Sequence, residues 1–101
     1  MIRVGNLRNL QLKENEILIK IDRSTIVGNP FYMKREEERN TVCDKYNEYF
    51  YKQIAISSKF NEYILDIIEK SKTKDIVLGC WCHPKRCHGD TILNYLNTII
   101  K

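Results

Sequence analysis

One uninterrupted apolar run constrains the fold of this chain more than any other feature. It extends from Ile76 to Cys80 and lies between two amphipathic segments, residues 57–71 and 92–100. A strand that is apolar at every position is typical of a parallel sheet covered on both faces. Parallel strands need long crossover connections, which are usually helical. The run therefore predicts an α/β protein with helices on either side of this strand in the sequence.

Other segments supply the remaining elements of such a fold. Residues 16–22 have the alternation of a strand, and residues 2–4 are a candidate for a short edge strand. Ser57 or Ser58 is expected to cap the second of three helices. Helical spacing predicts buried stripes at Val42, Cys43, Tyr46, Tyr49 and Phe50, then at Phe60, Tyr63, Ile64, Ile67 and Ile68, and last at Ile92, Leu93, Leu96, Ile99 and Ile100.

These elements predict a single α/β domain over residues 1–101. Its architecture would be a small Rossmann-like sandwich, a mostly parallel sheet flanked by three helices. If residues 16–22 and 76–80 run parallel, their carboxyl ends meet at one edge of the sheet, where ligands bind in such folds. The loop after Asp22 is therefore expected close to the loop after Cys80.

Composition narrows the classes of function. The chain has 101 residues, no apolar run of transmembrane length and no signal peptide at its N-terminus, so we expect a cytoplasmic protein without a membrane partner. In that compartment its four cysteines would be free, catalytic or metal-bound. The net charge is +4, with 17 basic residues scattered among 13 acidic ones. This pattern argues against a nucleic-acid partner and suits a small anionic ligand.

The segment 79–90 carries most of the reactive side chains, and it permits three interpretations. It holds three of the four cysteines, both histidines and the only tryptophan. In the first interpretation the segment binds zinc, although the spacing of its ligands is not a usual one for zinc. In the second, Cys82 or Cys87 is a nucleophile activated by His88, and Asp90 orients His88 or acts as a base. In the zinc interpretation, the ligands would be Cys80, Cys82, Cys87 and His88.

In the third interpretation the segment forms part of a ligand pocket. Cys82, His88 and Asp90 would line it, and the amides at the start of the last helix would meet a phosphate or a hydroxyl. Asp90 is equally suited to capping that helix. Trp81 is expected to be a core or covering residue, and Cys43 and Tyr46 to be core residues.

Three residues outside this segment complete the predicted pocket. The turn Gly28-Asn29-Pro30-Phe31 would hold the Asn29 amide in place, with Gly28 free to adopt positive φ. Arg39 stands at a predicted helix start, where the helix macrodipole disfavours a cation. A carboxylate or phosphate partner is therefore expected for Arg39, and Glu36, Glu37 or Glu38 would be the nearest intramolecular one. Arg23 follows the first main strand and would lie at the same edge.

These motifs resemble those of a family of small bacterial and phage proteins classed as a domain of unknown function. The resemblance covers about residues 17–96 and departs at Asp22, where the family tends to have glycine. It implies a compact Rossmann-like fold, in the neighbourhood of domains that bind or process nucleotide-derived ligands. The matching elements are Arg23, Gly28-Asn29-Pro30-Phe31, Arg39 with Tyr46, Gly79-Cys80-Trp81-Cys82 with Pro84, and Cys87-His88-Gly89-Asp90.

We therefore expect binding of a small phosphorylated, nucleotide-like ligand at the carboxyl edge of the sheet, without a cofactor. In a phage protein, in the host cytoplasm, this would sequester a nucleotide immune signal that is cyclic or derived from ADP-ribose. A homodimer would close the shallow pocket. Alternatives are a nucleotide hydrolase or glycosidase using His88 and Asp90 or a cysteine nucleophile, and a structural zinc-binding interaction module. The expected pocket residues are Arg23, Asn29, Arg39, Cys82, His88 and Asp90.

Overall fold

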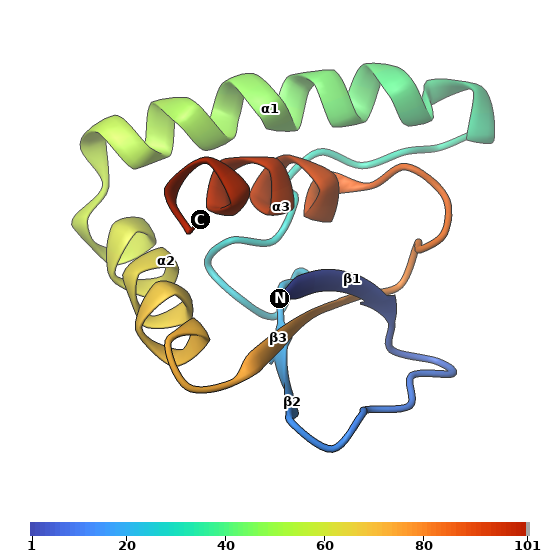
Figure 1. The fold of residues 1–101 in the computed structure, drawn as a ribbon. Coiled ribbons are helices and arrows are strands. Elements are labelled where there is room, and N and C mark those ends of the chain that lie inside the picture. Colours follow the sequence, from blue (N-terminus) through green and yellow to red (C-terminus); the bar gives the residue numbers. More distant parts are fainter. Residues whose placement is uncertain (101) are drawn as a thin grey trace.

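Three parallel strands and three helices make up the protein, as the computed structural model of residues 1–100 shows (Figure 1). The sheet has the order β1-β3-β2, and both outer strands pair in parallel with β3. This is the small, Rossmann-like α/β fold that the apolar run predicts. The elements are β1 (Ile2–Asn6), β2 (Glu16–Lys20), a 3₁₀ turn η1 (Glu36–Glu38), α1 (Arg39–Ile56), α2 (Ser58–Ser71), β3 (Asp75–Cys80) and α3 (His88–Ile99).

The central strand β3 is buried on both faces. Ile76 and Leu78 point to one face and belong to a core cluster that includes side chains of all three helices. Val77 and Gly79 point to the other face, since side chains alternate along a strand. On that face Leu7, from the connection between β1 and β2, lies so close that a Cβ added to Gly79 would be 2.6 Å from its side chain. Helices therefore cover one face of β3 and the β1–β2 connection covers the other.

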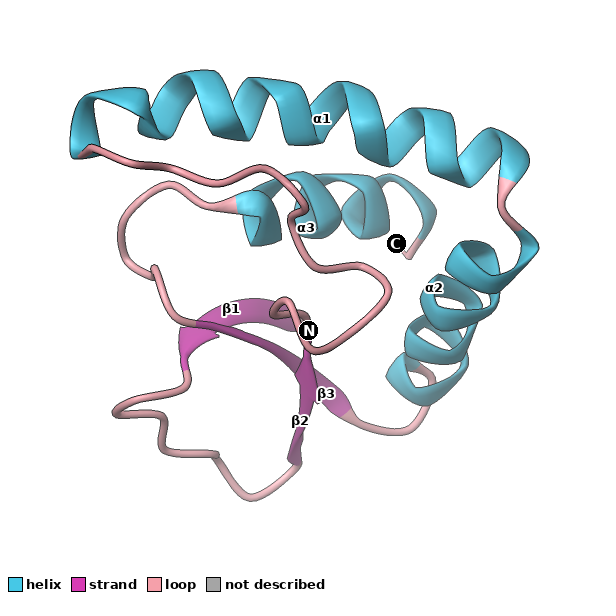
Figure 2. Cartoon of the chain, turned by 180° about the vertical axis from the view of Figure 1, so that it is seen from behind, coloured by secondary structure: helices cyan, strands magenta, loops and turns pink. Residues whose placement is uncertain are grey.

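The helices pack as their apolar stripes predict, with one exception. The Ser57 hydroxyl accepts a hydrogen bond from the amide of Phe60 and caps α2. α3 lies between α1 and the sheet, and α2 contacts β3 (Figures 1 and 2). The prediction that Ile99 is buried is wrong: 46% of this side chain is exposed, because it lies at the last turn of α3, away from the sheet. None of the helices in residues 1–100 combines the length and apolar character that a bilayer crossing requires.

A long loop between β2 and α1 lies over the carboxyl edge of the sheet. In Figure 2 it passes α3 on its way to the start of α1. Its path is fixed at Ile21, whose amide donates to the Gly79 carbonyl at 3.0 Å, and at Val27, whose carbonyl accepts from the Tyr46 hydroxyl at 2.6 Å. Tyr46 is fully buried, which confirms its prediction as a core residue. The loop after Asp22 thus lies beside the loop after Cys80, as expected.

Candidate functional site

A pocket of about 230 Å³ opens at the carboxyl ends of β2 and β3. Its walls come from the β2–α1 loop, the first turns of α1, and the loop between β3 and α3. Five of the six predicted pocket residues line it, and Asp90 does not. The lining residues are Asp22, Arg23, Asn29, Phe31, Tyr32, Met33, Arg39, Val42, Cys43, Cys80, Trp81, Cys82, Arg86, Cys87 and His88.

The turn at residues 28–31 is held by Arg23. The Arg23 guanidinium donates from Nε to the Asn29 carbonyl and from Nη2 to the Phe31 carbonyl, both at 3.0 Å. It also lies over the ring of Tyr32, 4.2 Å from the ring centroid. These partners carry no net charge, so the guanidinium keeps its attraction for an anion. Arg23 therefore both builds the wall and supplies a cation to it.

Asn29 and Gly28 differ from expectation in their details. The Asn29 Oδ1 accepts from the Phe31 amide at 2.9 Å, which fixes the orientation of the side-chain amide. Gly28 does not adopt positive φ. Glycine is required there because a Cβ would lie 2.4 Å from the Asp22 carbonyl oxygen and 2.6 Å from the Arg23 Cα. The turn is thus closed by backbone contact.

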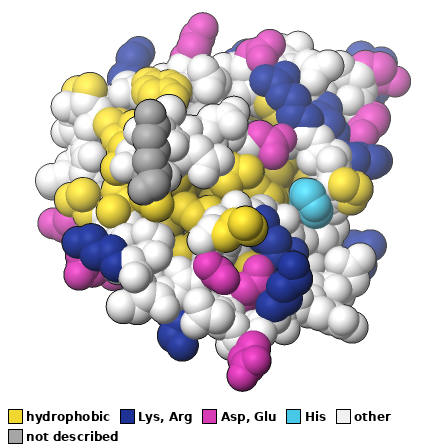
Figure 3. All heavy atoms as spheres, viewed as in Figure 1, with side chains coloured by type: hydrophobic (Ala, Val, Ile, Leu, Met, Phe, Trp, Pro, Cys, Tyr) yellow, Lys and Arg dark blue, Asp and Glu magenta, His cyan; other side chains and the backbone are white. Residues whose placement is uncertain are grey.

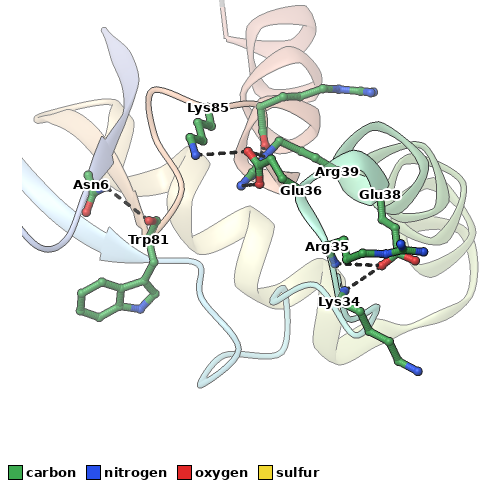
Figure 4. Close-up of polar contacts among 9 residues, drawn as sticks. Asn6, Lys34, Arg35, Glu36, Glu38, Arg39, Trp81 and Lys85 are labelled. Atoms are coloured by element: carbon green, nitrogen blue, oxygen red, sulfur yellow. Dashed lines mark hydrogen bonds and ion pairs between the residues drawn. The ribbon is translucent and has the colours of Figure 1, made fainter.

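Arg39 is engaged by the carboxylate of Glu36 (Figure 4). Its Nε and Nη2 donate to the two Glu36 oxygens at 3.0 and 2.9 Å, and its Nη1 donates to the Arg86 carbonyl at 2.9 Å. The Lys85 ammonium lies 3.2 Å from the same carboxylate. Arg39 and Lys85, in that order of effect, lower the pKa of Glu36 to about 2. An Arg–Lys pair at the pocket rim therefore grips an intramolecular carboxylate, one of the three partners expected.

Four thiols face this one pocket. The Sγ atoms of Cys80 and Cys87 lie 3.3 Å apart and both residues are buried, whereas Cys82 is half-buried. The hydrogen bond from Cys87, assisted by the amides of Cys82 and His83, lowers the pKa of the Cys80 thiol below its usual range. The same contact, with burial, raises the pKa of Cys87, so Cys80 is the more readily ionised thiol of the pair. Cys43 is buried on α1, as expected, and its thiol also borders the cavity.

The predicted zinc ligands are not brought together as a set. Within residues 1–100, no group of three His, Cys, Asp or Glu side chains is arranged to hold a metal ion. Cys80 and Cys87 contact each other, but the His88 ring points its Nε2 to a backbone carbonyl. A zinc site built from these residues would require His88 or Cys82 to move.

His88 is a neutral residue of fixed tautomer. Its Nε2 lies 2.5 Å from the Ile21 carbonyl oxygen, which can only accept, so Nε2 carries the proton. Burial, aided by the charge of Arg23, lowers the pKa of His88. The ring is therefore uncharged at neutral pH, and Nδ1 is the nitrogen that can contact a ligand. At Nδ1 it can accept a hydrogen bond from a hydroxyl or take a proton.

Of the two roles predicted for Asp90, the structure shows the one at the helix start and not the one in the pocket. Its Oδ2 accepts from the Cys87 amide at 3.2 Å, and its own amide donates to the Cys87 carbonyl at 3.0 Å, at the start of α3. This reciprocal contact holds the carboxylate at the helix end. Its position in the sequence predicted a place in the pocket, but the Cys87 amide, three residues earlier in the chain, binds the carboxylate instead.

Trp81 is exposed, and its prediction as a core or covering residue is wrong. Its indole is 57% exposed and borders the pocket, because Nε1 donates to the Asp22 carboxylate at 3.1 Å and holds the ring outside the core. Asp22 also accepts from the Ser24 hydroxyl at 2.5 Å, which is the main cause of its lowered pKa. Asp22 thus orients the only tryptophan.

Two residues that the sequence analysis missed also shape the site. Asn6, at the end of β1, donates from Nδ2 to the Trp81 carbonyl at 3.3 Å (Figure 4). It also donates to the His83 carbonyl at 2.9 Å. Arg86 lines the pocket and donates to Asp44 of α1 at 2.8 Å. Both fasten the loop between β3 and α3. The predicted edge strand stopped at residue 4, two residues short of Asn6, which ends β1.

The charges on the surface are mixed. On the face seen in Figure 3, Lys and Arg side chains lie beside Asp and Glu side chains and form no continuous basic stripe. One of the described ion pairs joins Lys70 to Asp66, one turn apart on α2. On this face the charges are mixed, as the scattered basic and acidic residues of the sequence predict.

The comparisons with known proteins return a family and nothing finer. A family model described as "Domain of unknown function (DUF4326)" matches residues 5–98, nearly the whole chain. No curated protein and no solved structure matches the chain.

Proposed function

We propose that this chain, which belongs to the family described as "Domain of unknown function (DUF4326)", binds a small phosphorylated, nucleotide-like ligand in the pocket at the carboxyl edge of its sheet. The observation that carries the proposal is the bidentate contact of Arg39 with the Glu36 carboxylate at the pocket rim. A guanidinium binds carboxylate and phosphate oxygens with the same two-pronged geometry. Glu36 therefore marks where an anionic group of a ligand would lie.

The rest of the pocket suits the remaining parts of such a ligand. Trp81 and Tyr32 expose 57% and 74% of their surface beside the cavity and offer flat faces to a base. The neutral His88 can accept from a sugar hydroxyl. Pockets that enclose drug-sized ligands are usually about 300–1,000 Å³. The observed 230 Å³ fits the sugar and phosphate of a mononucleotide, with the base at the exposed aromatic rings.

Glu36 is in this proposal an internal competitor for the ligand. It belongs to the short turn η1, and its side chain is 54% exposed, so it can leave Arg39 without unfolding a helix. A ligand phosphate would replace it between Arg39 and Lys85. The ligand would have to replace both hydrogen bonds of the bidentate contact, and a phosphate offers the same paired oxygens with a greater negative charge.

Calorimetric titration with a panel of ligands tests the proposal. The panel contains AMP, ADP-ribose, NAD and cyclic nucleotides, with uncharged adenosine as the control. Phosphorylated members should bind and adenosine should bind far more weakly. Cyclic nucleotides and ADP-ribose derivatives also probe the predicted role in sequestering an immune signal. If no phosphorylated member binds at millimolar concentration, the proposal fails.

A pair of matched variants isolates the role of Glu36. Glu36→Gln removes the competing charge and should raise the affinity for AMP by at least about fivefold, the upper limit for an ordinary exposed ion pair, because the contact with Arg39 is bidentate. Glu37→Gln removes the same charge from the next residue, whose contact is to Arg35 at 4.0 Å, and should leave the affinity unchanged. Arg39→Ala should abolish binding, and its fold is checked by circular dichroism. Equal effects of the two glutamine variants would show that the affinity for AMP depends on the net charge of the protein and not on the contact between Glu36 and Arg39.

A nucleotide hydrolase or glycosidase is the second candidate function. The neutral His88, with Nδ1 as a proton acceptor in the pocket, favours it, although Asp90 is held in the helix cap. Mass analysis of each panel member after incubation separates the two functions. Recovery of intact ligand supports binding alone, and recovery of fragments that requires His88 supports catalysis.

A further inference from the structure

The contact between Cys80 and Cys87 points to a chemical modification that ligand binding does not explain. Cys80 ends β3 and Cys87 is the N-cap of α3, and their Sγ atoms lie 3.3 Å apart. A disulfide has an S–S distance of about 2.04 Å, so the sulfurs need to approach by about 1.3 Å. We propose that Cys80 and Cys87 form a reversible disulfide at the floor of the pocket. Formation of this disulfide does not require the proposed ligand, although both cysteines line the same pocket.

The pocket gives a small oxidant access to this buried pair. The side chains of Cys80 and Cys87 are 1% and 4% exposed, but both line the cavity, which opens to solvent. A molecule such as hydrogen peroxide fits a cavity of about 230 Å³. Buried thiols elsewhere in a core lack such a route.

The reaction with peroxide balances in two steps. The thiolate of one cysteine attacks a peroxide oxygen, the O–O bond breaks, and a sulfenic acid and one water form. The thiol of the second cysteine then attacks the sulfenic sulfur, the S–O bond breaks, and a second water leaves. Each sulfur loses one electron and the peroxide gains two. A small dithiol or thiol reductant reverses the oxidation by thiol–disulfide exchange.

The other two cysteines make a different pairing less favourable. Cys43 is on α1 and Cys82 is in the loop, and the sulfur–sulfur contact among the described residues joins Cys80 to Cys87. The backbone of Cys87 is held at the start of α3 by two hydrogen bonds with Asp90, which keep this residue beside Cys80. The proposal therefore names one pair out of the four cysteines.

Peptide mapping tests the proposal on the intact protein. Purified, reduced protein is treated with hydrogen peroxide, its remaining thiols are alkylated, and it is digested with trypsin. Cleavage after Lys74, Lys85 and Arg86 puts Cys80 and Cys82 on residues 75–85 and Cys87 on residues 87–101. We expect these two peptides to be joined after oxidation, separated again by a reductant, and Cys43 to be alkylated.

Single cysteine variants show which two cysteines form the crosslink. Cys82→Ser should keep the crosslink, which assigns it to Cys80, and Cys87→Ser should remove it while preserving the helix cap with a hydroxyl. A crosslink that disappears in Cys82→Ser, alkylation of all four cysteines after peroxide, or a zinc ion bound to these thiols in the purified protein would each overturn the proposal. No nucleotide is present, so failure of the ligand panel has no effect on this result.

Discussion

The buried hydroxyl of Tyr46 gives a quantitative test of how the loop between β2 and α1 is anchored. It donates to the Val27 carbonyl at 2.6 Å, and the side chain is 0% exposed. Tyr46→Phe keeps the ring and removes this donor, and water cannot replace it. The loss of a hydrogen bond that leaves a buried acceptor without this partner costs about 1–3 kcal/mol. For a domain of this size each kcal/mol lowers Tm by about 4–8 °C.

The stability difference between the unmodified protein and Tyr46→Phe should also change with pH. Burial raises the pKa of Tyr46 well above its usual value. Above about pH 10 the unfolded chain therefore releases the Tyr46 proton while the folded protein keeps it, so the stability of the folded protein falls as pH rises. Between pH 10 and 11 this amounts to about 1 kcal/mol. Phenylalanine has no proton to release, so the advantage of the unmodified protein over Tyr46→Phe should shrink by that amount.

Urea denaturation at pH 7, 10 and 11, followed by circular dichroism, measures both effects. Tyr32→Phe is the matched control, because Tyr32 is 74% exposed and its loss of a hydroxyl should change stability by less than about 0.5 kcal/mol. Equal stability of Tyr46→Phe and the unmodified protein at pH 7 would refute the buried hydrogen bond. A difference that stays constant up to pH 11 would show that Tyr46 ionises inside the fold.

Three further predictions concern the pocket walls. Gly28→Ala should destabilise the protein by about 2–3 kcal/mol in urea denaturation, because its Cβ would meet backbone atoms of Asp22 and Arg23; an unchanged midpoint would contradict the close approach. The Glu36 carboxyl should titrate with a midpoint of about 2 in carbon NMR, so that its contact with Arg39 is complete above about pH 4.5 and lost as pH falls toward 2; an ordinary midpoint would mean that the contact is absent in solution. Asn6→Ala should speed tryptic cleavage at residues 85 and 86 about fivefold for each kcal/mol of lost tethering, while unchanged cleavage would show that the two loop carbonyls do not need Asn6.

The fold was largely predictable because its main signals are local. The apolar run that becomes β3, the stripes of α1 and α2, and the Ser57 cap are each visible within a short window of residues. The exceptions lie at element ends. Ile99 repeats the apolar period of α3 but falls beyond the reach of the sheet, which no periodicity reveals.

The pocket was predictable in place and only partly in composition. Parallel strands bring their carboxyl ends to one edge, so the loops after Asp22 and Cys80 had to meet there, and Arg23, Asn29, Arg39, Cys82 and His88 line one cavity as expected. Phe31, Tyr32 and Met33 follow the predicted turn, but their direction depends on how Arg23 holds the backbone.

Tertiary structure alone decided what each of these side chains does. Sequence placed Arg39 at a helix start and Glu36 three residues before it, but only packing showed that Lys85 joins them. Asp90 is taken by the Cys87 amide and Trp81 is held outward by Asp22. The Cys80–Cys87 contact requires both the end of β3 and the start of α3 to be in place. The sequence by itself determined the elements and the edge where the site lies, because local periodicity encodes them. The partners of each polar group came from the tertiary structure, because hydrogen bonds and ion pairs depend on distances of a few ångströms between distant segments.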